Sequence, residues 1–301
     1  MNYYNQIKEK LVDNEVYKKV KDYSKNRSDL ITYYEVGKLI VEAQGGESRA
    51  KYGDNLIKEY SLKLTKEVNK KYGERNLRNM RQFYIMFKNK IWHSKNAKLT
   101  WSHYKELLPI KNMIEIEYYI KISIEQNLSY RELHDKIKNK EYERLDNKTK
   151  EKLIVKAENE ITDFIKNPIL LKNSYNYTYI SEKILKKLIL EDMENFLTEL
   201  GEGFSFIKSE YKIKLGNRYN YIDLLLYNIK YNCYTVIELK VTELKSEHIG
   251  QIEKYINYID KNVKQIMQNK TIGIIICKRD NEFVMEYCSD SSIFKTTYKM
   301  I

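Results

Sequence analysis

The chain has 301 residues, is 42% hydrophobic and carries a formal net charge of +12 at pH 7. This composition excludes an intrinsically disordered protein, and the length suits two domains better than one. A surface this basic favours polyanionic partners, because each phosphate that it neutralises releases a condensed counterion. A genome that uses lysine heavily would produce the same charge, so the charge alone leaves the partner open.

The cysteines and the apolar runs indicate where the protein works. Cys233, Cys277 and Cys288 show neither paired nor C-x-x-C spacing, which excludes a disulfide framework and a zinc finger. No apolar run approaches the roughly 18 residues of a membrane span, and the first residues lack a signal-peptide core. We therefore expect a reduced, cytoplasmic protein without a membrane partner.

Residues 1–145 are expected to form an all-α domain. Apolar residues recur at helical spacing, and glycines follow several of the periodic segments, as at helix ends. The expected helices cover residues 30–43, 54–70, 74–87, 114–124 and 130–138.

The helix expected over 74–87 has an apolar stripe and a basic face. The stripe is formed by Leu77, Met80, Tyr84 and Phe87. A helix, a turn containing glycine and a second helix with a basic face resemble a helix-turn-helix reader of DNA. We therefore predict DNA contacts from the polar side chains of this helix, although the same residues would equally serve solubility. These side chains are Arg75, Arg78, Arg81 and Gln82.

Residues 146–175 are expected to connect two domains. The stretch 141–156 is dense in charge and poor in large apolar residues, and Asn167-Pro168 marks a further break. The remaining residues, 176–301, alternate between helix and strand patterns and predict an α/β domain with a mixed sheet. Helices are expected over 181–200 and 246–260, strands over 204–207, 211–215, 221–227, 233–241 and 271–277, and either element over 283–287. The fold class is therefore α+β overall.

Two neighbouring apolar runs in this domain contain charged residues. The run 221–226 includes Asp223, and the run 235–240 includes Glu238 and Lys240. Strand alternation places Glu238 and Lys240 on one face, and antiparallel pairing through a short hairpin can bring Asp223 beside Glu238. Two carboxylates on adjacent strands provide oxygen ligands for Mg²⁺, and a lysine beside them can offset charge on a phosphoryl group.

An E-x-K triplet by itself is a weak signal, because it is common in any chain rich in glutamate and lysine. Here both runs are apolar on both faces, and an isolated charge inside such a strand is costly. The pattern therefore predicts a metal-dependent phosphodiesterase site rather than a solvated strand.

The same residues resemble the motifs of a known superfamily. Asp223, Glu238-Leu239-Lys240 and the pair Gln251 and Tyr255 are similar to the motif set of the PD-(D/E)XK nucleases, including the Gln-x-x-x-Tyr helix of RecB-like members. More closely, the chain resembles the YhcG-type family of bacterial proteins, in which such a nuclease domain accompanies a helical N-terminal domain. The matching segments are residues 75–77, 80–84, 100–104, 196–204, 221–224, 237–240, 250–251 and 272–274.

This resemblance implies a restriction-endonuclease-like fold for residues 176–301, with Mg²⁺ or Mn²⁺ as cofactor. It implies that Asp223 and Glu238 are metal ligands, that Lys240 is the catalytic lysine, and that Gln251 positions this lysine or the nucleic-acid backbone.

Two further residues are assigned from the same resemblance. A further acid on the helix before the first strand is usual in the superfamily, and Glu194 is expected in that role. Tyr255 is expected to contact nucleic acid from the helix of Gln251.

The chain also departs from the family pattern. Ile184 and Lys186 stand where the family tends to carry two glutamates, and Ser209-Glu210 stand where an Arg-Gln pair often follows the first strand. These departures place the substrate contacts in doubt more than the metal site.

We therefore expect a Mg²⁺-dependent nuclease acting on DNA, with the helical domain recruiting the substrate. Genome defence or restriction-modification proteins are its expected context, and a homodimer is expected because nucleases that cut both strands often pair. The alternative is a binding module that holds DNA or a partner protein with a weak or silent nuclease core. A third possibility is a protein-interaction accessory whose charge is incidental. The complete acid-acid-lysine set favours the enzyme.

Overall fold

The computed structural model describes residues 3–20, 25–46, 54–88, 99–155, 158, 160–286, 288 and 290–301. The chain divides into two compact units, Met1–Tyr142 and Glu143–Ile301. The expected connecting segment, residues 146–175, lies within the second unit and contributes a helix and a strand to it. No helix among the described residues is long and apolar enough to cross a bilayer.

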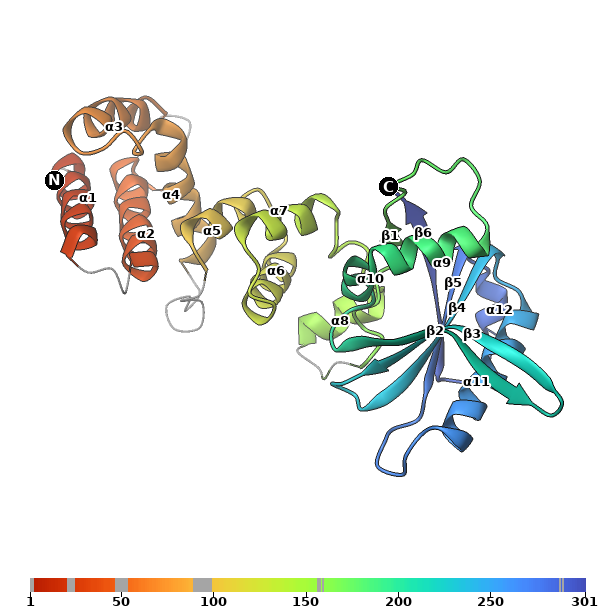
Figure 1. Ribbon diagram of the computed structural model, residues 1–301. Helices are drawn as coiled ribbons and strands as arrows, with labels where there is room; N and C mark the ends of the chain where they lie inside the picture. Colours follow the sequence, from red (N-terminus) through yellow and green to blue (C-terminus); the bar gives the residue numbers. More distant parts are fainter. Residues whose placement is uncertain are drawn as a thin grey trace. The chain divides into compact units, whose positions relative to one another are not determined.

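The described part of the first unit is helical, as the periodicity predicts (Figure 1). Capping side chains define several of its helix starts: Ser129, for example, accepts a hydrogen bond from the backbone N–H of Glu132. The helices are α1 (Tyr3–Val20), α2 (Lys25–Ala43), α3 (Asp54–Glu67), α4 (Glu74–Phe87), α5 (Trp101–Leu107), α6 (Met113–Glu125) and α7 (Tyr130–Lys138).

A close helix crossing organises the core of this unit. A Cβ atom on Gly37 of α2 would lie 2.1 Å from the carbonyl oxygen of Met80 on α4, so only glycine permits this approach. The buried residues of α4 are Leu77, Met80, Phe83 and Phe87. The expected stripe is therefore wrong at one position, because Phe83 is buried while Tyr84 is only partly buried against Tyr34.

The second unit is built on a six-stranded mixed sheet with the order β1-β6-β5-β4-β3-β2 (Figure 1). The pairs β2–β3 and β3–β4 are antiparallel, and the pairs β4–β5, β5–β6 and β1–β6 are parallel. The strands are β1 (Ile169–Leu171), β2 (Phe204–Leu215), β3 (Arg218–Asn228), β4 (Cys233–Glu243), β5 (Ile272–Arg279) and β6 (Ile293–Met300). Strands β1 and β6 have no counterpart among the predicted elements.

Helices cover both faces of the sheet. The helices are α8 (Asn147–Val155), α9 (Glu182–Glu191), α10 (Met193–Leu200), α11 (Ser246–Asn262) and α12 (Glu282–Glu286). One core joins α9 and α10 to β3, β4 and β5, and a second core joins α11 to the opposite face of these strands. Because β4 and β5 are parallel, α11 is the crossover between them. The single helix expected over 181–200 is interrupted at Asp192, which adopts a non-helical conformation.

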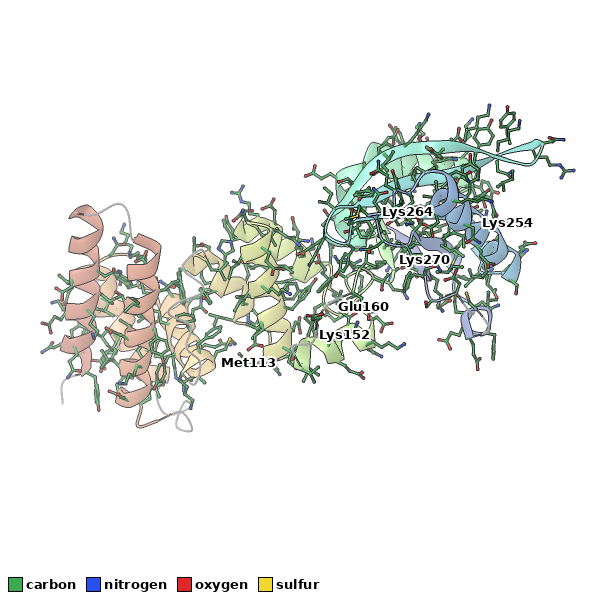
Figure 2. All side chains as sticks on the ribbon, turned by 90° about the horizontal axis from the view of Figure 1, so that it is seen from below. Met113, Lys152, Glu160, Lys254, Lys264 and Lys270 are labelled. Atoms are coloured by element: carbon green, nitrogen blue, oxygen red, sulfur yellow. The ribbon has the colours of Figure 1, made fainter. Side chains whose placement is uncertain are left out.

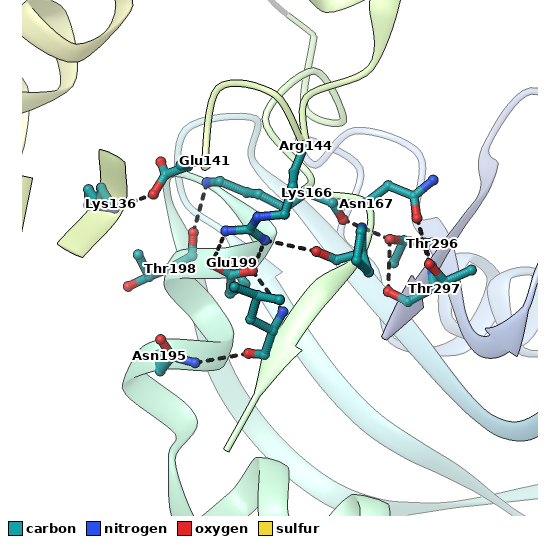
Figure 3. Close-up of polar contacts among 12 residues, drawn as sticks. Lys136, Glu141, Arg144, Lys166, Asn167, Asn195, Thr198, Glu199, Thr296 and Thr297 are labelled. Carbon is teal, nitrogen blue, oxygen red and sulfur yellow. Dashed lines mark hydrogen bonds and ion pairs between the residues drawn. The ribbon is translucent and has the colours of Figure 1, made fainter. Parts of the chain in front are cut away.

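A buried polar cluster ties the segment before β1 to the rest of this unit (Figure 3). Arg144 donates to Glu199 on α10 (Nη2–Oε1, 3.0 Å) and to the carbonyl oxygen of Pro168 (2.8 Å), and neither charged side chain is more than 10% exposed. Thr296 Oγ1 on β6 donates to the carbonyl oxygen of Lys166 (2.7 Å). The segment that was expected to be a linker is therefore part of the folded domain.

Candidate active site

Strands β3 and β4 separate at the acidic residues. Their ladder ends at the pair Leu224↔Ile237, while β3 remains paired with β2 and β4 with β5. Asp223 lies one residue beyond this end, and its Oδ2 accepts a hydrogen bond from the backbone N–H of Leu239 (3.0 Å). The same register places Asp223 opposite Glu238, so the two acids flank the point of separation.

Glu238 is a buried carboxylate that contacts one cation. Its side chain is 3% exposed, and Oε1 accepts a hydrogen bond from Lys240 Nζ (2.7 Å). Its other oxygen, Oε2, is buried and has no hydrogen-bond partner among the residues that the structure describes. Burial, reinforced by the negative charge of Asp223, raises the pKa of Glu238 to about 7. A second cation beside Oε2 would relieve this unfavourable environment.

Lys240 retains its proton in this environment. Burial lowers the pKa of Lys240, but the hydrogen bond to Glu238 and the nearby charges of Glu182 and Asp223 outweigh this effect and raise the pKa above its ordinary value. Glu182 Oε1, at the start of α9, lies 3.8 Å from Lys240 Nζ. Lys240 is therefore positively charged in the metal-free protein.

A second lysine, Lys186 on α9, also reaches the site. Its Nζ lies 2.9 Å from both Asp223 Oδ1 and Glu210 Oε1. Burial lowers the pKa of Lys186, but the hydrogen bonds to these two acids raise it above its ordinary value. Asp223 is therefore held by an ammonium group on one oxygen and by a backbone N–H on the other.

Helix α11 lies against the same region. Gln251 Nε2 donates to the hydroxyl group of Tyr255 (3.1 Å), and Tyr255 is only 5% exposed. Burial raises the pKa of Tyr255, and the negative charges of Glu238 and Asp223 raise it further. The Tyr255 hydroxyl therefore senses the charges of the two acids. The expected contact between Tyr255 and nucleic acid is not supported, because its ring is buried; the residue instead fixes Gln251.

The structure does not bring Glu194, the acid expected on the preceding helix, to the other site residues. Glu194 is exposed on α10, and it is Glu182 at the start of α9 that approaches Lys240. Sequence reasoning missed Glu182, and it noted Lys186 only as a departure from the family pattern. The one available signal was helical spacing, since residues four apart such as Glu182 and Lys186 share a helix face.

The predicted DNA-contacting face of α4 is partly used within the first unit. Arg78 forms an ion pair with Glu74 (2.8 Å), Arg81 Nε donates to Gln44, and Gln82 Nε2 donates to the carbonyl oxygen of Leu108 (2.6 Å). Arg75 is exposed. The side chain of Gln82 therefore has a structural partner that helical periodicity could not indicate.

The donor set fits a divalent metal ion that keeps most of its water. Asp223 and Glu238 supply carboxylate oxygens, and Glu238 Oε2 is the buried oxygen that lacks a partner. Within the described ranges no group of three or more histidine, cysteine, aspartate and glutamate residues could hold a metal. Two carboxylates with bound waters are sufficient for Mg²⁺, whereas a structural zinc site requires four ligands.

Two solved structures are similar to part of this chain. One is described as the crystal structure of a repair endonuclease from Pyrococcus abyssi, with 18% identity, coverage of 40% of this chain and 48% of that chain, and a TM-score of 0.29. The other is described as the structure of an EndoMS-dsDNA2 complex, with 16% identity, coverage of 42% and 48%, and a TM-score of 0.31. The matched part thus spans about half the length of each solved chain.

Each half of the chain matches a known domain family. Residues 162–300 match the family described as the YhcG PDDEXK nuclease domain, and residues 7–144 match the DUF1016 N-terminal domain. The protein named "Putative nuclease YhcG" from Escherichia coli (strain K12) is 27% identical over 309 residues, which cover 89% of this chain and 82% of that protein. The restriction-endonuclease-like fold expected from the motifs is confirmed, and so is the resemblance to the YhcG-type family, because a match to the DUF1016 N-terminal domain is followed by a match to the YhcG PDDEXK nuclease domain.

Proposed function

We propose that the chain hydrolyses phosphodiester bonds in DNA and depends on a divalent metal ion. The observation that supports this most strongly is the arrangement of Asp223, Glu238 and Lys240 at the separation of β3 and β4. Each of these charges is at least partly buried, and one carboxylate oxygen has no partner. A domain that only binds its ligand gains nothing from a buried carboxylate with one unsatisfied oxygen, because its desolvation is costly.

Asp223 and Glu238 would hold Mg²⁺ or Mn²⁺ in this proposal. When bound, such an ion lowers the pKa of a coordinated water and offsets negative charge on the phosphoryl oxygens. Lys240 supplies a second positive charge at the same place, and its raised pKa keeps it charged at neutral pH. Gln251, oriented by its hydrogen bond to Tyr255, is the polar group of α11 that would orient the lysine or the backbone of the substrate.

The helical unit would recruit the nucleic acid. The net charge of +12 favours a polyanion, and Arg75 on α4 is exposed. Arg78 and Arg81 can add phosphate contacts only if they leave their present partners, Glu74 and Gln44. Phosphate contacts of this kind would position the substrate without selecting its sequence.

A cleavage assay tests this proposal. Purified protein is incubated with linear, nicked, branched and single-stranded DNA in Mg²⁺ or Mn²⁺, alongside Glu238→Ala and Lys240→Ala prepared in the same way. We expect metal-dependent cleavage by the wild type and its loss in both variants. Equal cleavage by all three proteins would identify a contaminating nuclease and remove the basis of the proposal.

A binding module with a silent nuclease core is the second candidate, and one observation favours it. Lys186 neutralises Asp223 Oδ1, at a position where the resemblance leads one to expect an acid. If no DNA is cut while binding persists and weakens with rising salt, this second function is the correct one.

A further inference from the structure

The hairpin formed by β2 and β3 projects beyond the rest of the second unit, as both Figure 1 and Figure 2 show. We refer to residues 211–222 as the hairpin arm. Its turn is Gly216-Asn217, and the φ of 61° at Gly216 suits a tight two-residue turn. At its base, a register shift between Phe206 and Lys208 and a φ of 48° at Glu210 bend the outer strand. The backbone conformation at its base therefore determines the direction in which the arm projects.

One face of the arm is fixed to the domain. Ile213 and Ile222 are at most 1% exposed and belong to the core that contains α11. Tyr211 and Leu215 pack against the same core. The arm is thus anchored along one side and cannot be regarded as a loose loop.

The opposite face of the arm is exposed to solvent, and lysines and tyrosines alternate on it. Lys212 is paired across the two strands with Tyr221, and Lys214 with Tyr219. Both lysines are exposed, and the two tyrosines are 52% and 57% exposed. Lys212 Nζ lies 3.8 Å from the centre of the Tyr219 ring, so cations and aromatic rings are interleaved on one surface.

The charge of the arm is of one sign. Residues 211–222 include Lys212, Lys214 and Arg218 but no aspartate or glutamate. Lysines on an edge strand have a simpler explanation, which is that they prevent pairing with another sheet. That role does not account for Tyr219 and Tyr221, which expose large rings on β3 beside those lysines.

The arm leads directly to the candidate active site. Tyr221 lies two residues before Asp223 on the same strand, a separation of about 7 Å along an extended chain. Lys186 holds the base of the arm, because it contacts both Glu210 and Asp223. A strand held along the arm would therefore extend toward the acidic residues.

We propose that this face of the hairpin arm binds an unpaired nucleic-acid strand leading to the active site. Lys212 and Lys214 would contact phosphates, and the rings of Tyr219 and Tyr221 would stack on bases, which is how sequence-independent single-strand binders combine charge with aromatic surface. The inference rests on the proposed nuclease function for the class of ligand, but it is tested through binding without cleavage.

The test compares binding of the full-length protein to a fluorescent single-stranded 30-mer and to the corresponding duplex in EDTA, by anisotropy over a range of salt concentrations. The variants are Lys212→Ala/Lys214→Ala and Tyr219→Ala/Tyr221→Ala. We expect the lysine variant to reduce the salt dependence of single-strand binding by about 1.4 in log–log slope, since each phosphate contact contributes about 0.7. We expect the tyrosine variant to weaken binding about fivefold or more at an unchanged slope.

Two controls keep this test specific. Lys254→Ala/Lys261→Ala removes the same charge from exposed positions of α11 and should leave single-strand binding within about twofold of the wild type. Tyr219→Phe/Tyr221→Phe keeps the rings and should restore single-strand binding to the wild-type level.

Three results would overturn the inference. The first is an arm variant that binds the single strand as well as the α11 control does, which would mean that the lysines only protect the edge strand from pairing. The second is a loss confined to the duplex. The third is a lysine variant that loses affinity equally for the single strand and for heparin, together with a tyrosine variant that binds the single strand as the wild type does. This result would show a general basic patch. Failure of the wild type to cleave DNA would instead count against the nuclease function, because the binding measurement does not depend on it.

Discussion

Replacing Glu238 with glutamine is predicted to stabilise the metal-free protein at alkaline pH. The pKa of Glu238 is about 7, compared with 4.5 for an ordinary glutamate, because the carboxylate is buried near Asp223. Between these two values the folded protein retains a proton that the unfolded chain has released. Stability is therefore fully present below about pH 4.5 and declines as the pH rises through 7.

The magnitude follows from the difference between the two pKa values. A difference of 7 minus 4.5 corresponds to about 3 kcal/mol of stability lost by the wild type above pH 7. Glutamine has nearly the same shape and carries no charge, so Glu238→Gln should escape this loss. At pH 8 the variant should be more stable than the wild type by up to about 3 kcal/mol, and at pH 4.5 the two should differ little.

Denaturant unfolding in EDTA at pH 4.5, 6 and 8, followed by circular dichroism, measures this difference. Titrating groups away from the site affect both proteins equally, so the difference between their unfolding free energies reports on residue 238 and the groups coupled to it. Adding Mg²⁺ at pH 8 should stabilise the wild type more than the variant, since the ion binds the folded carboxylates. A difference that does not change with pH, or a variant less stable than the wild type at pH 8, would refute this account of the site.

Three further changes test separate parts of the structure. Lys186→Met removes the cation that occupies an oxygen of the proposed metal site, so it should increase affinity for Mg²⁺ in calorimetric titration; unchanged or weaker affinity would contradict this. Arg144→Met leaves the carboxylate of Glu199 buried without its counter-charge and should cost about 3–5 kcal/mol in denaturant unfolding, whereas a cost below about 1 kcal/mol would show that the buried pair matters little. Gly37→Ala should destabilise the helical unit by about 3 kcal/mol, because the added Cβ would collide with the backbone of Met80. Gly250→Ala is the control, because a Cβ there would meet no atom of the described residues within 4 Å. Similar unfolding midpoints for the two variants would exclude the close crossing.

Strand parity made the centre of the site predictable. Alternation alone placed Glu238 and Lys240 on one face, and a short hairpin brought Asp223 into register with Glu238. The point at which β3 and β4 separate was not predictable, because it depends on how far each strand continues with its other neighbour. That separation leaves the two facing acids just outside the β3–β4 ladder.

The helical contributions to the site were harder to predict. Glu182 approaches Lys240 and Lys186 contacts Asp223 because α9 packs on β4, and the orientation of a helix over a sheet is a tertiary property that periodicity does not contain. Strand β1 is only three residues long, and such a run cannot be distinguished from a loop by its pattern. His248 is only 6% exposed, and its Nδ1 accepts a hydrogen bond from the backbone N–H of Lys245 next to the start of α11, a contact that no sequence pattern indicates.

The central claim is that Asp223 and Glu238 bind the metal ion on which hydrolysis of DNA depends. The most direct measurement is the initial rate of cleavage of one labelled DNA by the wild type and by Asp223→Asn, each with saturating Mg²⁺ and with EDTA. The account predicts cleavage by the wild type in Mg²⁺ alone, with a rate at least about 100-fold lower for the variant, as is common when a group that stabilises the transition state is removed. Cleavage by the variant at the wild-type rate, or cleavage by the wild type that persists in EDTA, would contradict it.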